Sequence, residues 1–251
     1  MKRTVLVTGA ARGIGRAVAE RFAASGDVVM LHFANSRAAA EETLAALSGT
    51  GHHIIRGDLR VPQDAENIVA STVERLGRVD ILVNCAAAPM VAHPVDTVIY
   101  GAWQEAWQAA LDVNLVGTAN ITFCAAQQMI KQGDGGRIIN IGSRGAFRGE
   151  PEHPAYGASK AALHSLGQSL AVSLAPHNIA VTSVAPGFVS TERNEGRLNG
   201  PEGVAIAAQS PTGRVACADE IAAAVSFLAS PEAMWATGAI LDLNGASYLR
   251  T

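Results

Sequence analysis

The order of hydrophobic segments constrains the fold of this chain most strongly. Short runs of Val, Ile and Leu alternate with longer segments of helical periodicity. The runs lack regular polar alternation, which is typical of strands covered on both faces. We expect strands at Thr4–Thr8, Val28–Phe33, 54–56, 81–83, 137–141, 180–184 and 239–243. We expect helices at 14–24, 37–47, 65–76, 101–131, 155–174 and 219–229, the fourth broken near Gly117.

Regular strand–helix alternation predicts an α/β fold. The expected form is a single doubly wound (Rossmann-type) domain over residues 1–251, with a parallel sheet of about seven strands and helices on both faces. The least regular stretch, 188–213, holds three glycines and a proline between residues 196 and 203. Because long loops of this kind are often binding loops, we expect a substrate-binding lid there.

Composition limits the classes of partner. Of the 251 residues, 49% are hydrophobic and 16% charged, and the formal net charge is −3. Such a balance gives no general attraction to nucleic acid or to anionic lipid, so neither is an expected partner.

Cysteine content and hydropathy bear on location. The three cysteines, Cys85, Cys124 and Cys217, have neither metal-ligand spacing nor the number needed for a disulfide framework. The apolar run after Met1 is too short for a signal peptide, and we expect no apolar stretch to approach the length and hydropathy of a membrane span. We therefore expect a cytoplasmic protein without a metal site.

A glycine-rich turn follows the first predicted strand. Gly9, Gly13 and Gly15 lie between that strand and the helix at 14–24. Glycine lets the backbone approach a pyrophosphate closely, and the helix start supplies free N–H groups. In this context the turn predicts dinucleotide binding; the alternative is an ordinary glycine-rich turn.

The end of the second strand predicts which dinucleotide binds. NAD enzymes carry an acidic residue there for the ribose 2′-hydroxyl, but this chain has Ser36 and Arg37, and Arg12 within the glycine turn. Two guanidinium groups and a hydroxyl suit a 2′-phosphate, which predicts NADP(H) over NAD(H). Ser36 is also expected to cap the helix at 37–47. The plainer alternative is that Ser36 only caps and Arg37 is solvated.

A tyrosine and a lysine share one helix face. Tyr156 and Lys160 are four residues apart at the start of the helix at 155–174. An ammonium about 6 Å from the phenol would favour the phenolate by ~3 kcal/mol, or ~2 pKa units, at an effective dielectric of ~20. The pair therefore predicts acid–base chemistry, although an incidental surface pair is the alternative.

Two further polar residues are candidates. Ser143 follows the strand at 137–141, so it falls at the carboxyl edge of the sheet, where such folds bind ligands. Asn114 lies within a long predicted helix, where its amide favours a structural hydrogen bond.

Together these motifs resemble the classical short-chain dehydrogenase/reductase family. The resemblance spans nearly the whole chain and follows the family's order. It rests on Thr8-Gly9-x-x-x-Gly13-x-Gly15, Asp58-Leu59, Asn84-Cys85-Ala86-Ala87, Asn114, Ser143, Tyr156 with Lys160, and Pro186-Gly187-x-Val189-x-Thr191. Ala87 stands where the family usually has glycine.

The resemblance implies a role for each position. Gly9, Gly13, Ile14 and Gly15 would hold the pyrophosphate, Asp58 and Leu59 would flank the adenine, and Asn84, Ala86 and Ala87 would line the cofactor floor. Pro186, Gly187, Val189 and Thr191 would lie at the nicotinamide end. Tyr156 would exchange a proton with the substrate oxygen, Ser143 would steady that oxygen, Lys160 would bind the nicotinamide ribose, and Asn114 would hold a relay water.

The resemblance also implies a substrate class and an assembly. The segment Phe33-Ala34-Asn35-Ser36-Arg37 is similar to that of bacterial 3-oxoacyl-(acyl-carrier-protein) reductase-like members. This implies an NADP-dependent ketone reductase that forms a homotetramer. A sugar or polyol dehydrogenase remains an alternative, as does a non-catalytic dinucleotide sensor. We also hypothesise that some of Arg144, Arg148, Arg193 and Arg197 face an anionic or oxygenated substrate; otherwise they are solvated.

Overall fold

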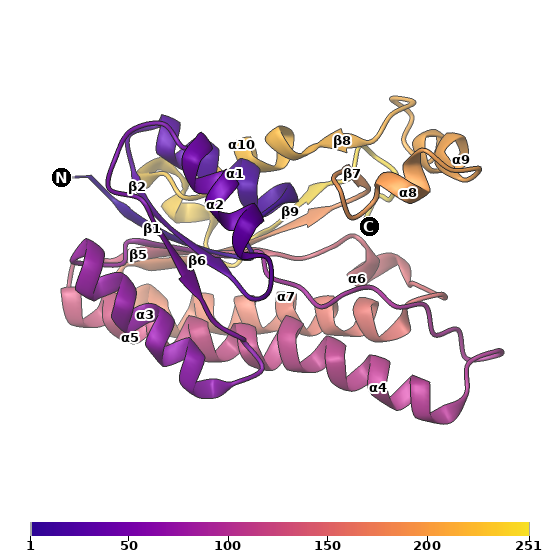
Figure 1. Cartoon of the computed structure of the whole chain (residues 1–251), viewed down its shortest axis with the longest axis horizontal. Coiled ribbons are helices and arrows are strands. Elements are labelled where there is room, and N and C mark those ends of the chain that lie inside the picture. Colours follow the sequence, from indigo (N-terminus) through magenta and orange to yellow (C-terminus); the bar gives the residue numbers. More distant parts are fainter. Residues whose placement is uncertain (1, 251) are drawn as a thin grey trace.

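A seven-stranded parallel sheet forms the centre of the computed structural model, which describes residues 2–250 (Figure 1). The strand order is β3-β2-β1-β4-β5-β6-β9. The strands are β1 (Thr4–Thr8), β2 (Val28–Phe33), β3 (His53–Arg56), β4 (Ile81–Asn84), β5 (Gly136–Ile141), β6 (Ile179–Pro186) and β9 (Ile240–Leu243). Every residue of β1, β4 and β6 is buried, which explains their unbroken apolar sequence. The predicted doubly wound α/β fold is confirmed.

Helices cover both faces of the sheet (Figure 1). One face carries α1 (Gly13–Ala24), α2 (Arg37–Ala46) and α10 (Ala218–Leu228); the other carries α3 (Pro62–Leu76), α4 (Tyr100–Leu111), α5 (Thr118–Gln132) and α7 (Pro154–Leu174). Each face has its own apolar core. Phe22 and Val225 belong to the first core, and Ile68 and Met129 to the second.

The expected break near Gly117 is wrong. Between α4 and α5 the helix continues through a π-helical segment, η1 (Asp112–Gly117). A Cβ at Gly117 would collide with the Leu59 backbone carbonyl. Glycine at this position therefore allows the β3–α3 loop to approach the helix closely and does not end the helix. The helix widens into a π turn over these residues.

The helical run from α4 to α5 also bears on the membrane question. Tyr100–Gln132 is long and apolar enough to cross a membrane, with 44% of its most apolar window buried inside the structure. The prediction that no stretch has this length and hydropathy is therefore wrong. A core helix passes the same test, so the finding by itself is weak evidence for a membrane span.

The predicted lid has more structure than expected. It contains β7 (Val189–Ser190), which pairs with β8 (Ala216–Cys217), and the short helices α8 (Glu195–Leu198) and α9 (Gly203–Ala208). Three other short elements are α6 (Gly145–Arg148), η2 (Ala175–His177) and η3 (Pro231–Ala236).

Candidate active site

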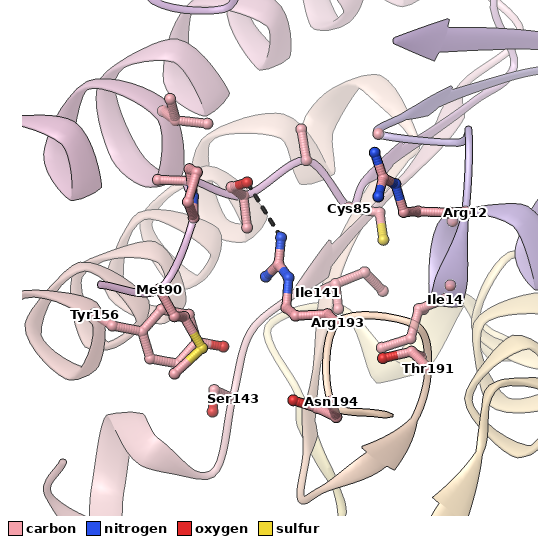
Figure 2. A pocket seen from close by; sticks show the side chains of 18 of the residues that line it. Arg12, Ile14, Cys85, Met90, Ile141, Ser143, Tyr156, Thr191, Arg193 and Asn194 are labelled. Atoms are coloured by element: carbon pink, nitrogen blue, oxygen red, sulfur yellow. Dashed lines mark hydrogen bonds between the residues drawn. The ribbon is translucent and has the colours of Figure 1, made fainter. Parts of the chain in front are cut away.

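A cleft of about 1040 Å³ lies at the carboxyl edge of the sheet. Its walls come from the glycine turn, the segments after β2, β4 and β5, the start of α7 and the first half of the lid. Its volume is at the upper end of the range for ligand pockets, ~300–1000 Å³. Figure 2 shows Tyr156 and Ser143 at one end of this space and Arg12 and Ile14 at the other.

The glycine turn requires its glycines. Gly9 has a φ of 66°, and a Cβ there would lie 2.8 Å from the Ala86 Cα. A Cβ on Gly15 would collide with the Gly9 carbonyl, and Gly13 has a φ of 57°. Helix α1 begins at Gly13 without a side-chain cap, so its first N–H groups remain available to a ligand. This arrangement fits a pyrophosphate.

His32, at the end of β2, supports this turn. Its Nδ1 accepts a hydrogen bond from the Gly9 N–H at 3.3 Å, and its Nε2 lies 3.1 Å from the Gly57 carbonyl oxygen. Burial lowers the pKa of the imidazole, which keeps the ring neutral and able to do both. His32 was not predicted as a site residue, because its two partners are distant in sequence.

The residues expected to select the cofactor separate into two groups. The Arg12 Nη2 donates to the Ser36 Oγ at 2.6 Å, and both residues line the cleft together with Asn35. Arg37 instead pairs with Glu41 at 2.8 Å and does not line the cleft. The Ser36 side chain makes no capping hydrogen bond, so the predicted cap is wrong.

The expected adenine end lies beside this group. Asp58 and Leu59 line the cleft, as predicted for adenine contacts. Arg60, which was not predicted as a site residue, also lines the cleft and pairs with Asp58 at 2.5 Å. The Arg60 guanidinium lowers the pKa of the Asp58 carboxyl and partly neutralises the charge of this carboxylate.

The floor of the cleft is held from below. The Thr8 Oγ1 accepts hydrogen bonds from the backbone N–H groups of Cys85, at 3.0 Å, and Ala86, at 3.1 Å. Ala86 and Ala87 line the cleft, whereas Asn84 is buried and donates to Thr122 and Asn140. Asn84 thus acts within the sheet, beneath the floor. Pro186, Gly187, Val189 and Thr191 line the opposite wall.

The reactive end brings together Tyr156, Ser143 and Lys160, all of which line the cleft. Tyr156 is half-buried near the start of α7, and Ser143 follows β5. The Lys160 Nζ donates to the Ile141 carbonyl at 2.7 Å and lies 5.8 Å from the centre of the Tyr156 ring. Burial lowers the pKa of Lys160 to about 8, so the ammonium remains the main form at neutral pH.

The expected depression of the Tyr156 pKa is wrong for this structure. Burial raises the pKa of the phenol, and this outweighs the opposing effects of the Ser143 hydrogen bond and of the Arg193 charge. The Lys160 ammonium donates its hydrogen bond to the Ile141 carbonyl oxygen and not to the phenol oxygen. The sequence predicted the pairing of the two side chains but not the cost of their burial.

Asn114 lies in η1 beneath this end, and it is buried with 1% of its surface exposed. Its Oδ1 accepts from the Ala88 N–H at 2.8 Å, and its Nδ2 donates to the Ser159 Oγ at 2.9 Å. Both amide ends are therefore occupied by structural hydrogen bonds. The side chain joins the loop after β4 to helix α7.

Several charged residues near the reactive end were not predicted as site residues. Glu150, Glu152 and His153 line the cleft around Tyr156. Arg193, one of the four arginines hypothesised above to face a substrate, lines it as well. Figure 2 shows the Arg193 guanidinium in the middle of the cleft, where it donates weakly to the Ala87 carbonyl at 3.4 Å. Of the four arginines considered above, Arg144, Arg193 and Arg197 line the cleft, and Arg148 does not. Among residues 2–250, no group of three or more metal-ligating side chains is assembled.

Comparison with known proteins agrees with this geometry. Residues 9–245 match the family described as Enoyl-(Acyl carrier protein) reductase. The chain is 38% identical to an L-rhamnose 1-dehydrogenase (NAD(P)(+)) from Sphingomonas sp. strain SKA58, over 98% of this chain and 96% of that protein. It is 34% identical to a 3-oxoacyl-(acyl-carrier-protein) reductase from Vibrio cholerae, over 98% of both. A crystal structure of a dehydrogenase/reductase from Sinorhizobium meliloti superposes with a TM-score of 0.87 at 34% identity, covering 98% of this chain and 95% of that one.

The chain therefore belongs to the short-chain dehydrogenase/reductase family, as its motifs predicted. Members of this family are oxidoreductases that use a nicotinamide cofactor.

Proposed function

We propose that this protein is an NADP(H)-dependent oxidoreductase that transfers a hydride between nicotinamide and a carbonyl or secondary alcohol, acting mainly as a ketone reductase. The observation that carries the proposal is the grouping of Tyr156, Ser143 and Lys160 in the cleft that also holds the glycine turn. A dinucleotide bound along the turn would supply a hydride at the reactive end.

The protein's own side chains would handle the proton and the oxygen. The Ser143 and Tyr156 hydroxyls would donate hydrogen bonds to the substrate carbonyl oxygen, and Tyr156 would pass its proton to that oxygen as it becomes an alkoxide. Lys160, charged at neutral pH, would stabilise the phenolate that remains. Asn114 would hold the backbone around this group in place. Each end of its amide makes one hydrogen bond and keeps a second donor or acceptor position for a relay water.

The preference for NADP(H) rests on Arg12 and Ser36. Their side chains are hydrogen-bonded to each other at the mouth of the cleft, and β2 ends without a carboxylate. A 2′-phosphate would accept charge-assisted hydrogen bonds from the guanidinium and one from the hydroxyl.

A sugar or polyol dehydrogenase is a second candidate, supported by the polar rim of the reactive end. Glu150, Glu152 and His153 offer acceptors and donors that suit several hydroxyl groups. The relative from Sphingomonas is named for the oxidation of such a substrate. A non-catalytic sensor would have no need of the Tyr156–Lys160 pair, so it is the least favoured.

A panel of ketones, 3-oxoacyl thioesters, sugars and polyols tests these candidates. The panel is run in both directions while NADPH absorbance is followed. Reduction of ketones without oxidation of sugars supports the first candidate, and the reverse supports the second. No turnover in either direction would contradict both.

We further propose that the chain works as one domain with 188–213 as its substrate lid, in the cytoplasm, as a homotetramer. Exposed apolar side chains on α5 and α7, such as Phe123 and Val172, support cover by further copies. Light scattering after size exclusion measures the assembly.

A further inference from the structure

Arg144, the residue directly after Ser143, is a buried cation without a carboxylate partner. Only 5% of its surface is exposed, and it forms no ion pair with any carboxylate of residues 2–250. Burying an unpaired charge is costly, and burial lowers the pKa of this guanidinium. A residue kept under such conditions has to be held by other polar groups.

Those groups belong to three different segments. The Arg144 Nη2 donates to the Gln209 Oε1 at 2.6 Å, at the end of the lid, and its Nη1 donates to the Ser247 Oγ in the C-terminal segment. The guanidinium also lies 5.3 Å from the centre of the Phe188 ring, at the start of the lid. Its own backbone N–H donates to the Pro186 carbonyl at 2.9 Å. Arg144 thus contacts both ends of the lid.

The middle of the lid packs largely on itself. Helix α8 packs on α9, and Ile206 is the buried side chain of these two short helices. Firm attachments lie at both ends of the lid. At its start β7 pairs with β8, and at its base the Ser210 Oγ donates to the Gly245 carbonyl at 2.6 Å beside Gln209. Arg144 joins this base to the loop carrying Ser143, and the exposed Arg148 donates to the same Gln209 oxygen.

We propose that Arg144 is a positioning residue that couples the lid to the Ser143 loop, so that the lid's closed arrangement and the placement of the Ser143 hydroxyl depend on each other. The planar guanidinium suits this role because it can donate in two directions at fixed angles, which a lysine ammonium on a flexible stem cannot reproduce. The catalytic consequence rests on the proposed function, since it concerns the oxygen that Ser143 would bind.

The coupling is tested from both sides. Arg144→Lys keeps the positive charge but loses the planar pair of N–H donors. Gln209→Ala removes the acceptor at the end of the lid and leaves the sequence of the Ser143 loop unchanged. Hydrogen exchange is measured for segments 143–148 and 188–213, together with kcat, KM and the Kd for NADPH. We expect Gln209→Ala to speed exchange at least threefold in 143–148 as well as in the lid, and to lower kcat/KM at least fivefold without changing the NADPH Kd.

Arg148→Ala is the matched control. Arg148 is exposed and donates to the same Gln209 oxygen at 2.9 Å, so its removal leaves the Arg144 bond in place. We expect less than a twofold effect on exchange in 143–148 and on kcat/KM.

Faster exchange confined to the lid in Gln209→Ala would overturn the proposal, as would an equal effect of Arg148→Ala. If Arg144→Lys does not fold, Gln209→Ala alone decides. If the wild-type protein turns over nothing in the panel, the proposed function fails, while the exchange measurements still test the coupling.

Discussion

Replacing Arg12 with alanine tests how the protein distinguishes NADPH from NADH. The Arg12 guanidinium donates a hydrogen bond to the Ser36 hydroxyl at 2.6 Å, and both residues line the cleft. A 2′-phosphate bound there would therefore contact both side chains. A hydrogen bond to a charged group contributes ~1.5–3 kcal/mol. Arg12 is exposed, so solvent screening favours the lower figure of ~1.5 kcal/mol, or about tenfold in the dissociation constant.

Arg37→Ala is the matched control, because Arg37 is also exposed but pairs with Glu41 outside the cleft. We expect Arg12→Ala to lower the NADPH-over-NADH affinity ratio about tenfold, and Arg37→Ala to lower it less than threefold. Fluorescence titration of both cofactors at ~20 mM and ~300 mM salt measures the ratio, and the Arg12 effect should shrink at high salt. An unchanged ratio in Arg12→Ala, or a larger effect of Arg37→Ala, would show that the phosphate lies elsewhere.

Three further predictions concern the reactive end and the glycine turn. Tyr156→Phe should lower kcat by ~10²–10⁴ while the NADPH Kd stays within twofold, and a smaller loss in stopped-flow turnover would remove Tyr156 as the proton donor. Glu150 raises the pKa of Tyr156 and Arg193 lowers it. Because alcohol oxidation needs the phenolate, its pH profile should move to lower pH in Glu150→Gln and to higher pH in Arg193→Gln. Shifts of the same sign in the two variants would contradict this. Gly9→Ala should lower the free energy of unfolding by ~1–3 kcal/mol more than Gly26→Ala in urea titrations. Gly26 shares the left-handed backbone, with a φ of 90°, but a Cβ there meets nothing within 4 Å, so equal losses would rule out the clash with Ala86.

The sequence predicted the sheet and the position of most site residues because those features depend on local order. Val-rich runs become buried strands, and parallel strands bring their carboxyl ends to one edge. Gly9 and Ser143 closely follow such ends, and Tyr156 lies in the first turn of the long helix after β5, so their convergence could be expected. The predicted break at Gly117 was wrong because the glycine is required by contact with the Leu59 carbonyl. Leu59 lies nearly sixty residues away, so the sequence pattern around Gly117 could not show this contact.

The hydrogen-bond or ion-pair partner of each polar side chain could not be predicted in the same way. Arg37 forms an ion pair with Glu41, and Lys160 donates to the Ile141 carbonyl. The Asn114 amide forms hydrogen bonds with Ala88 and Ser159. These choices depend on which neighbours folding brings within about 3 Å and on how much water it removes. The sequence by itself determined the alternation of strands and helices, the glycine turn and the tyrosine–lysine spacing, because hydrophobic patterning, backbone freedom and helical period are local properties. Only the tertiary structure decided the raised pKa of Tyr156 and the attachment of the lid through Arg144, because burial and long-range hydrogen bonds exist only once distant segments have packed together.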